Sequence, residues 1–153
     1  MAKALRSLGA IAAGITVAFI LVVAVEFFGA VVHPVPADFK GTMEEMCLHV
    51  ERFPHWVLAL VVPAWAGTAF ASTWIAGRLG NRFCALFIGL LLLAAVIFNV
   101  SMLPYAIWFK ILTLLAVPAA IVLGDRLSIR REAPAADAKR PQAVSCPEGA
   151  GWR

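Results

Sequence analysis

The chain has 153 residues, of which 62% are hydrophobic and 14% are charged. A water-soluble domain carries about 45–50% apolar and about 25% charged residues, so this composition excludes an ordinary soluble globule and is typical of a membrane protein. The formal net charge is +4, and its meaning depends on where the basic residues fall along the chain.

Four long apolar runs cover residues 8–32, 56–77, 83–103 and 105–124. Each has about 20–25 residues, enough for a helix rising about 1.5 Å per residue to cross a hydrocarbon core of about 30 Å. A segment in lipid must pair its own backbone groups, so each run predicts a transmembrane α-helix. Because short connections make sequential helices antiparallel neighbours, residues 1–129 are expected to form an all-α membrane protein, an up-down-up-down bundle of four transmembrane helices.

The connection between the first two runs contains a further predicted helix. Thr42 and Glu45 have the spacing of a capping box, in which each side chain binds the backbone N–H of the other residue. Behind Thr42, apolar residues recur at positions i, i+3, i+4 and i+7 over about residues 43–52. This spacing predicts a short amphipathic helix in the first outer loop, lying on the surface of the bundle.

Basic residues are unevenly divided between the two sides of the predicted spans. By the positive-inside rule the richer side is cytoplasmic, which places the N-terminus and the C-terminus there in a plasma membrane or bacterial inner membrane. Topology therefore accounts for the net charge, and no nucleic-acid partner is expected. Ten basic residues fall on the richer side and three on the other, namely Lys3, Arg6, Arg78, Arg82, Arg126, Arg130, Arg131, Lys139, Arg140 and Arg153 against Lys40, Arg52 and Lys110.

Residues 130–153 differ in character from the four apolar runs. They are polar, are interrupted by proline and show no helical or strand periodicity. Such a segment cannot bury enough apolar surface to offset the entropy of ordering its backbone. We therefore expect a disordered cytoplasmic tail.

Glu26 is the only charged residue in the first apolar run. By helical rise it lies about 9 Å from the centre of that run, and an ionisable group at such a depth is a candidate functional residue. His33 follows at i+7 on the same helix face, and Asn99 lies at a similar depth in the third run. Glu26, His33 and Asn99 are thus a candidate intramembrane polar site, serving either as a structural hydrogen-bonding group or as the titrating group of a carrier.

The second apolar run carries an unbroken row of small residues at i, i+4 spacing. Rows of this kind let helix backbones approach closely, so the row is a predicted helix-packing face. Packing within one chain is favoured over a dimer contact. The row consists of Ala64, Thr68, Ser72, Ala76 and Gly80.

Sequence motifs for catalysis are not found. No glycine-rich phosphate loop, Cys-x-x-Cys pair or zinc-protease motif occurs, and Glu45 and His49 at i, i+4 are more typical of a surface ion pair than of a metal site. No cofactor and no metal are expected. The preferred hypothesis is a non-enzymatic structural or accessory membrane component, whose partners are the lipid bilayer and a second copy or another membrane protein. The alternative is a small transporter or proton-coupled carrier that uses Glu26.

Overall fold

The computed structural model describes residues 2–129, so the predicted tail at 130–153 lies outside the described residues. Residues 2–129 form five α-helices and no β-strand. This confirms the all-helical fold predicted from the sequence. The helices are α1 (Ala2–Val32), α2 (Met43–Glu51), α3 (His55–Leu79), α4 (Arg82–Met102) and α5 (Ile107–Ile129).

The four long helices, α1, α3, α4 and α5, are each long and apolar enough to cross a membrane. Each overlaps one predicted span. Helix α1 begins at Ala2, ahead of the predicted start at residue 8. The fourth helix, predicted over residues 105–124, differs from the prediction at both ends. The helix begins only at Ile107, because residues 103–106 form the turn that follows α4. It also continues past Asp125 and Arg126, since a charged residue ends an apolar run without ending a helix.

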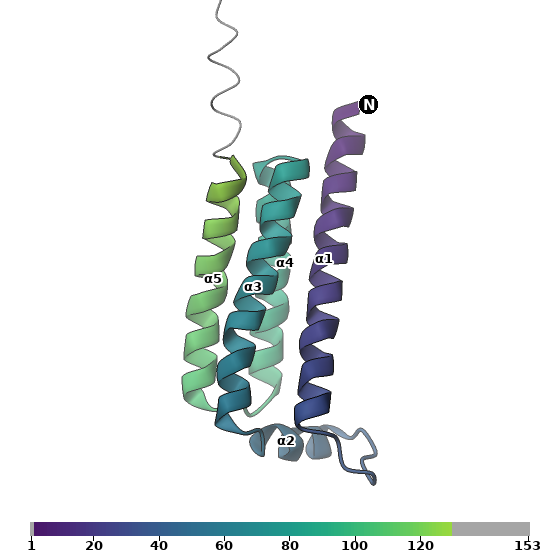
Figure 1. Cartoon of the computed structure of the whole chain (residues 1–153), viewed down its shortest axis with the longest axis vertical. Helices are drawn as coiled ribbons and strands as arrows, with labels where there is room; N and C mark the ends of the chain where they lie inside the picture. The colour runs from purple at the N-terminus through teal and green to yellow at the C-terminus, as the bar shows by residue number, and fades with distance from the viewer. Residues whose placement is uncertain (1, 130–153) are drawn as a thin grey trace, which may run out of the picture.

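The four long helices lie side by side, and α2 with its flanking loop lies across one end of them (Figure 1). We call this the α2 end. The first and last described residues lie at the opposite end, which we call the far end. Helix α3 contacts the three other long helices, whereas α1 packs mainly on α3 and very little on α4.

The helix predicted in the first loop is present as α2, and its predicted capping box is confirmed. The Glu45 backbone N–H donates to Thr42 Oγ1 at 3.3 Å, and the Thr42 N–H donates to Glu45 Oε2 at 3.4 Å. The Lys40 N–H donates to the same carboxylate oxygen at 2.8 Å. Gly41, between Lys40 and Thr42, has a φ of +76°, in the left-handed region that favours glycine. The Glu45 carboxylate thus binds the backbone at the start of α2.

Small residues bring α1 close to α3 and α4 at the far end. A Cβ atom added to Gly14 would lie 3.0 Å from Ile88 Cγ1 and 3.1 Å from Ala76 Cβ. One added to Gly80 would lie 2.7 Å from Ala10 Cβ. Larger side chains at these places would push the helices apart, so α1 is held tightly at this end.

Aromatic side chains fill the core between α3, α4 and α5 at the α2 end. Phe109 is fully buried, and its ring centroid lies 5.8 Å from that of Trp65 and 4.8 Å from that of Tyr105. Helix α1 contributes no residue to this core cluster. Because α1 joins the packed core only at the far end, space remains beside it at the α2 end.

Candidate functional site

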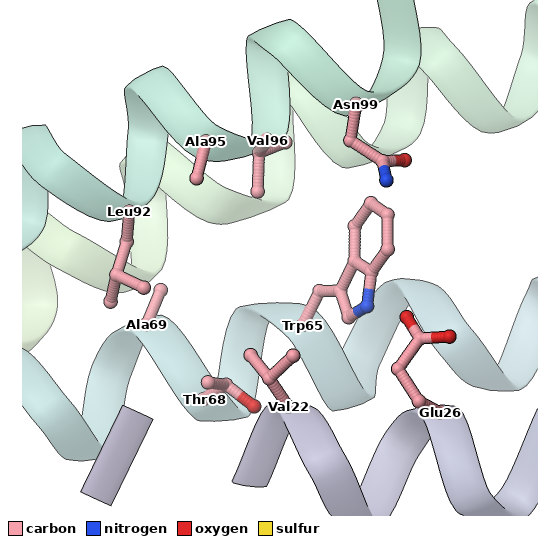
Figure 2. Close-up of a pocket in the computed structure, with 9 residues that line it drawn as sticks. All are labelled: Val22, Glu26, Trp65, Thr68, Ala69, Leu92, Ala95, Val96 and Asn99. Atoms are coloured by element: carbon pink, nitrogen blue, oxygen red, sulfur yellow. The ribbon is translucent and has the colours of Figure 1, made fainter. Parts of the chain in front are cut away.

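A cavity of about 130 Å³ lies between α1, α3 and α4, and we call it the Trp65 cavity (Figure 2). Its polar side chains are Glu26 from α1, Trp65 and Thr68 from α3, and Asn99 from α4. In Figure 2 the indole of Trp65 lies between the carboxylate of Glu26 and the amide of Asn99. The rest of the lining is aliphatic, from Val22, Ala69, Leu92, Ala95 and Val96.

A second, larger cavity of about 460 Å³ adjoins the first at the α2 end, and we call it the histidine cavity. Glu26 and Asn99 line both cavities, so these two residues border both spaces. His33 and His49 also line the histidine cavity. The structure therefore brings Glu26, His33 and Asn99, the three residues of the predicted polar site, to one cavity.

Two polar atoms of this site are buried without a hydrogen-bond partner. They are Asn99 Oδ1 and His33 Nε2. Glu26 itself is exposed, and α1 packs much less on α4 than on α3. A buried carbonyl oxygen without a donor costs free energy, so the site has unused capacity to accept a hydrogen bond.

Tyr105 adds a phenol to the wall of the histidine cavity, from the turn between α4 and α5. Burial, and after it the negative charge of Glu26, raise the pKa of Tyr105 to about 12. Both causes disfavour the phenolate. The hydroxyl therefore remains protonated near neutral pH.

His33 and His49 close the α2 end of the histidine cavity as a stacked pair. Their ring centroids are 4.4 Å apart with an interplanar angle of 24°, and Phe53 lies 4.6 Å from the ring of His33. Burial, and then the charge of His33, lower the pKa of His49 below its ordinary value of 6.5. Two facing imidazoles repel when both are charged, so the stack favours a neutral His49.

The possible pairing of Glu45 with His49 on a metal ion gains no support from the structure. The carboxylate of Glu45 accepts hydrogen bonds from the backbone at the start of α2. Within residues 2–129 no group of three or more His, Cys, Asp or Glu side chains is placed to hold a metal ion.

The predicted packing row on α3 lies against α1 of the same chain. At the far end, Ser72 and Ala76 meet Gly14, and Gly80 meets Ala10. Toward the α2 end the row opens into a groove of about 380 Å³ between the two helices. Two residues of the row, Ala64 and Thr68, line this groove together with Leu21, Ala24 and Val25 of α1.

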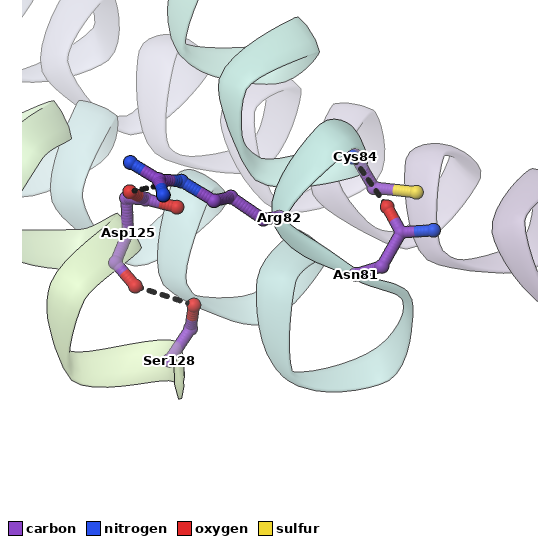
Figure 3. Close-up of polar contacts among 5 residues, drawn as sticks. All are labelled: Asn81, Arg82, Cys84, Asp125 and Ser128. Carbon is purple, nitrogen blue, oxygen red and sulfur yellow. Dashed lines mark hydrogen bonds and ion pairs between the residues drawn. The ribbon is translucent and has the colours of Figure 1, made fainter. Parts of the chain in front are cut away.

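An ion pair that the sequence analysis did not predict joins α4 to α5 at the far end (Figure 3). Arg82 Nε lies 3.4 Å from Asp125 Oδ2, and the Asp125 side chain is only 6% exposed. Beside it, the Ser128 hydroxyl donates to the Asp125 carbonyl at 2.7 Å. Asn81 caps α4 by accepting a hydrogen bond from the Cys84 N–H at 3.0 Å. The opposite charges at the start of one apolar run and the end of the next could have indicated the pair.

No protein-family model, curated protein or solved structure matches this chain. Its class therefore rests on the fold and the cavities alone. The chain is a small all-helical protein with four helices able to cross a membrane, compatible with a membrane protein.

Proposed function

We propose that the protein is a non-enzymatic, multi-pass integral membrane protein, a structural or accessory component of a plasma membrane or bacterial inner membrane. One observation carries the membrane assignment: large apolar side chains are exposed along all four long helices. Phe19 of α1, Leu60 of α3, Leu90 of α4 and Ile107 of α5 are each at least 51% exposed. A soluble monomer does not present so much contiguous apolar surface to water, whereas lipid tails solvate it.

We propose an up-down-up-down arrangement with both termini in the cytoplasm and α2 as an amphipathic helix on the outer surface. The ten-to-three division of basic residues supports this orientation. On α2, Glu44 and Glu51 are exposed whereas Val50 is 5% exposed. Met43 and Leu48 are also exposed, and at a membrane surface these apolar side chains would contact lipid.

The proposal of a non-enzymatic role is supported by the geometry of the Trp65 cavity. Thr68 is the only hydroxyl among the described residues that line it. Its Oγ1 already donates to the Ala64 carbonyl at 2.9 Å. The hydroxyl proton of Thr68, which a general base would have to remove, is thus already donated to a backbone carbonyl. Glu26 and Thr68 therefore do not form an activated nucleophile pair.

Cysteine labelling of intact cells tests the proposed orientation. Cys47 on α2 is half-buried and should react with a membrane-impermeant maleimide, whereas Cys146 in the tail should react only after the membrane is permeabilised. Cys84 is fully buried and should stay unreactive in the folded protein, which gives an internal control. Labelling of Cys146 from outside would show the orientation to be reversed.

A second candidate function, a small proton-coupled carrier that uses Glu26, is favoured by one specific observation. Glu26 lines two adjoining cavities instead of pairing with a residue of the packed core. A carboxylate that faces a space large enough for a solute can exchange a proton for that solute. The close glycine contacts of α1 lie toward the far end, and α1 contributes no residue to the core cluster at the α2 end, so α1 is less tightly packed there.

Proteoliposomes containing the full chain separate the two candidate functions. A carrier should change the lumenal pH when its solute is added, and Glu26→Gln should abolish the change because the amide keeps the shape of the side chain but cannot titrate. Glu51→Gln is the matched control, since that carboxylate is exposed on α2 and lines neither cavity. If lumenal pH responds equally in wild type and Glu26→Gln, the carrier function is excluded and the structural role remains.

A further inference from the structure

We propose that the Trp65 cavity and the histidine cavity together bind a ligand that carries a primary ammonium group on an apolar body of about one aromatic ring. The proposal rests on the carrier function suggested above and names its substrate class. It follows from the charge, the hydrogen-bonding capacity and the size of the two cavities.

The charge of the lining favours a cation. Glu26 is the only acidic side chain among the described residues of the two cavities, and neither lysine nor arginine is among them. The two histidines of the lining, His33 and His49, stack on each other at the α2 end of the histidine cavity. Glu26 lines both cavities. A bound cation would pair with its carboxylate at a site partly shielded from water, whereas a bound anion would be repelled by it.

The hydrogen-bonding groups favour a primary amine over a quaternary one. Asn99 Oδ1 is a buried acceptor without a donor, and Asn99 lines both cavities together with Glu26. A primary ammonium has three N–H donors, so it can donate to the Glu26 carboxylate and to a further acceptor of the lining. A quaternary ammonium has none, so it would pair with the carboxylate by charge alone.

The Trp65 cavity suits a small apolar body. Its volume of about 130 Å³ is close to the roughly 150 Å³ of an apolar cavity that holds a benzene molecule. Aliphatic side chains form most of its wall, and the Thr68 hydroxyl is already satisfied by the Ala64 carbonyl. The indole of Trp65, beside the Glu26 carboxylate, adds an aromatic face that attracts a cation.

A titration series with one ring and four head groups tests this inference. The full chain in phosphatidylcholine nanodiscs is titrated at pH 7 with benzylamine, benzyltrimethylammonium, benzyl alcohol and benzoate, and binding is followed by saturation-transfer NMR against empty nanodiscs. Benzylamine should bind at least tenfold more tightly than the quaternary cation or the alcohol, and benzoate should not bind. Equal binding of benzoate, or of the quaternary cation, would overturn the proposal.

Variants at Glu26 and Asn99 test whether these two residues bind the ligand. Glu26→Gln should weaken benzylamine binding at least tenfold and Asn99→Leu several-fold, whereas Glu51→Gln should leave it unchanged. Circular dichroism establishes whether each variant is folded. If Glu26→Gln is not folded, the effect of Asn99→Leu on benzylamine binding is used as the test. Undiminished binding in both cavity variants would overturn the proposal.

The apolar body assigns the ammonium group to a soluble amine, because the ammonium of an ethanolamine lipid is joined to a phosphate that the Glu26 carboxylate would repel. Phosphatidylethanolamine added to the nanodiscs should therefore leave benzylamine binding unchanged. Competition by the lipid would overturn the proposed apolar body.

Failure of this inference can be told from failure of the carrier function. If benzylamine binds but the lumenal pH of proteoliposomes does not change, the carrier function is excluded and the ammonium site is retained. If solutes without an amine drive proton movement and benzylamine does not bind, the ammonium site is excluded and the carrier function is retained.

Discussion

Replacement of Gly124 by alanine probes the close contact between α5 and α3. An added Cβ would lie 2.9 Å from the Phe70 carbonyl oxygen, 3.3 Å from Thr73 Cβ and 3.3 Å from the Trp74 nitrogen. Two of these atoms belong to the backbone of α3 and cannot rotate away, so the helices must separate by a few tenths of an ångström. Overpacking of this kind costs about 1–3 kcal/mol, against a gain of about 0.5–1 kcal/mol from replacing a helical glycine. We expect Gly124→Ala to lower the free energy of unfolding by about 1–2 kcal/mol.

Gly67→Ala on α3 is the matched control, because nothing lies within 4 Å of its added Cβ. This variant should gain about 0.5–1 kcal/mol from helix propensity alone. Both free energies can be measured by reversible unfolding in mixed detergent micelles, followed by far-ultraviolet circular dichroism. If Gly124→Ala has the same free energy of unfolding as Gly67→Ala, the result contradicts the close contact between α5 and α3 at Gly124.

Three further predictions concern the ion pair, the histidine stack and the helix cap. Arg82→Gln should lower the free energy of unfolding, measured in the same mixed micelles, by about 1–2 kcal/mol, because it leaves the nearly buried Asp125 carboxylate unpaired. Adding Asp125→Asn should recover part of this loss. If the double variant is no more stable than Arg82→Gln, the ion pair is contradicted. Because folding lowers the pKa of His49, the unfolded chain binds the proton more readily, so stability should be full above pH 6.5 and fall as the pH drops from 6.5 toward the lowered pKa. Hydrogen exchange of the α2 amides should show this loss in the wild type and a smaller one in His49→Gln, and equal pH slopes would contradict the assignment. Thr42→Ala should weaken α2 by about 1 kcal/mol and speed exchange of its amides but not those of α3, whereas Thr42→Ser should retain most of the protection.

Much of the fold could be predicted from the sequence because its two strongest patterns are local. An apolar run long enough to span a bilayer and a Thr-x-x-Glu capping box each depend on neighbouring residues only, and both led to helices found in the structure. The end of α5 could not be placed in this way. Asp125 ends the apolar run, but its charge is paired with Arg82 from α4, so the helix continues in a buried environment. That pairing depends on how two helices pack.

The candidate site could be predicted only in part for the same reason. Depth along the helices indicated that Glu26 and Asn99 would lie at one level, and both line the two cavities. Trp65 could not be singled out, since one aromatic residue in an apolar run has no distinguishing pattern. The stacking of His33 on His49 depends on the path of residues 34–42, which no periodicity fixes.

The link between α3 and α4, formed by Gly80 and the capping residue Asn81, constrains how the chain can enter a bilayer during synthesis. Two extended residues reach about 7 Å, roughly a quarter of the hydrocarbon thickness of about 30 Å. The C-terminal end of α3 and the N-terminal end of α4 must therefore stay on one face of the membrane from the moment both leave the ribosome. In a membrane, Arg78 and Arg82, which flank the link, would lie on the same face, so α3 and α4 could reverse their orientation only as a pair.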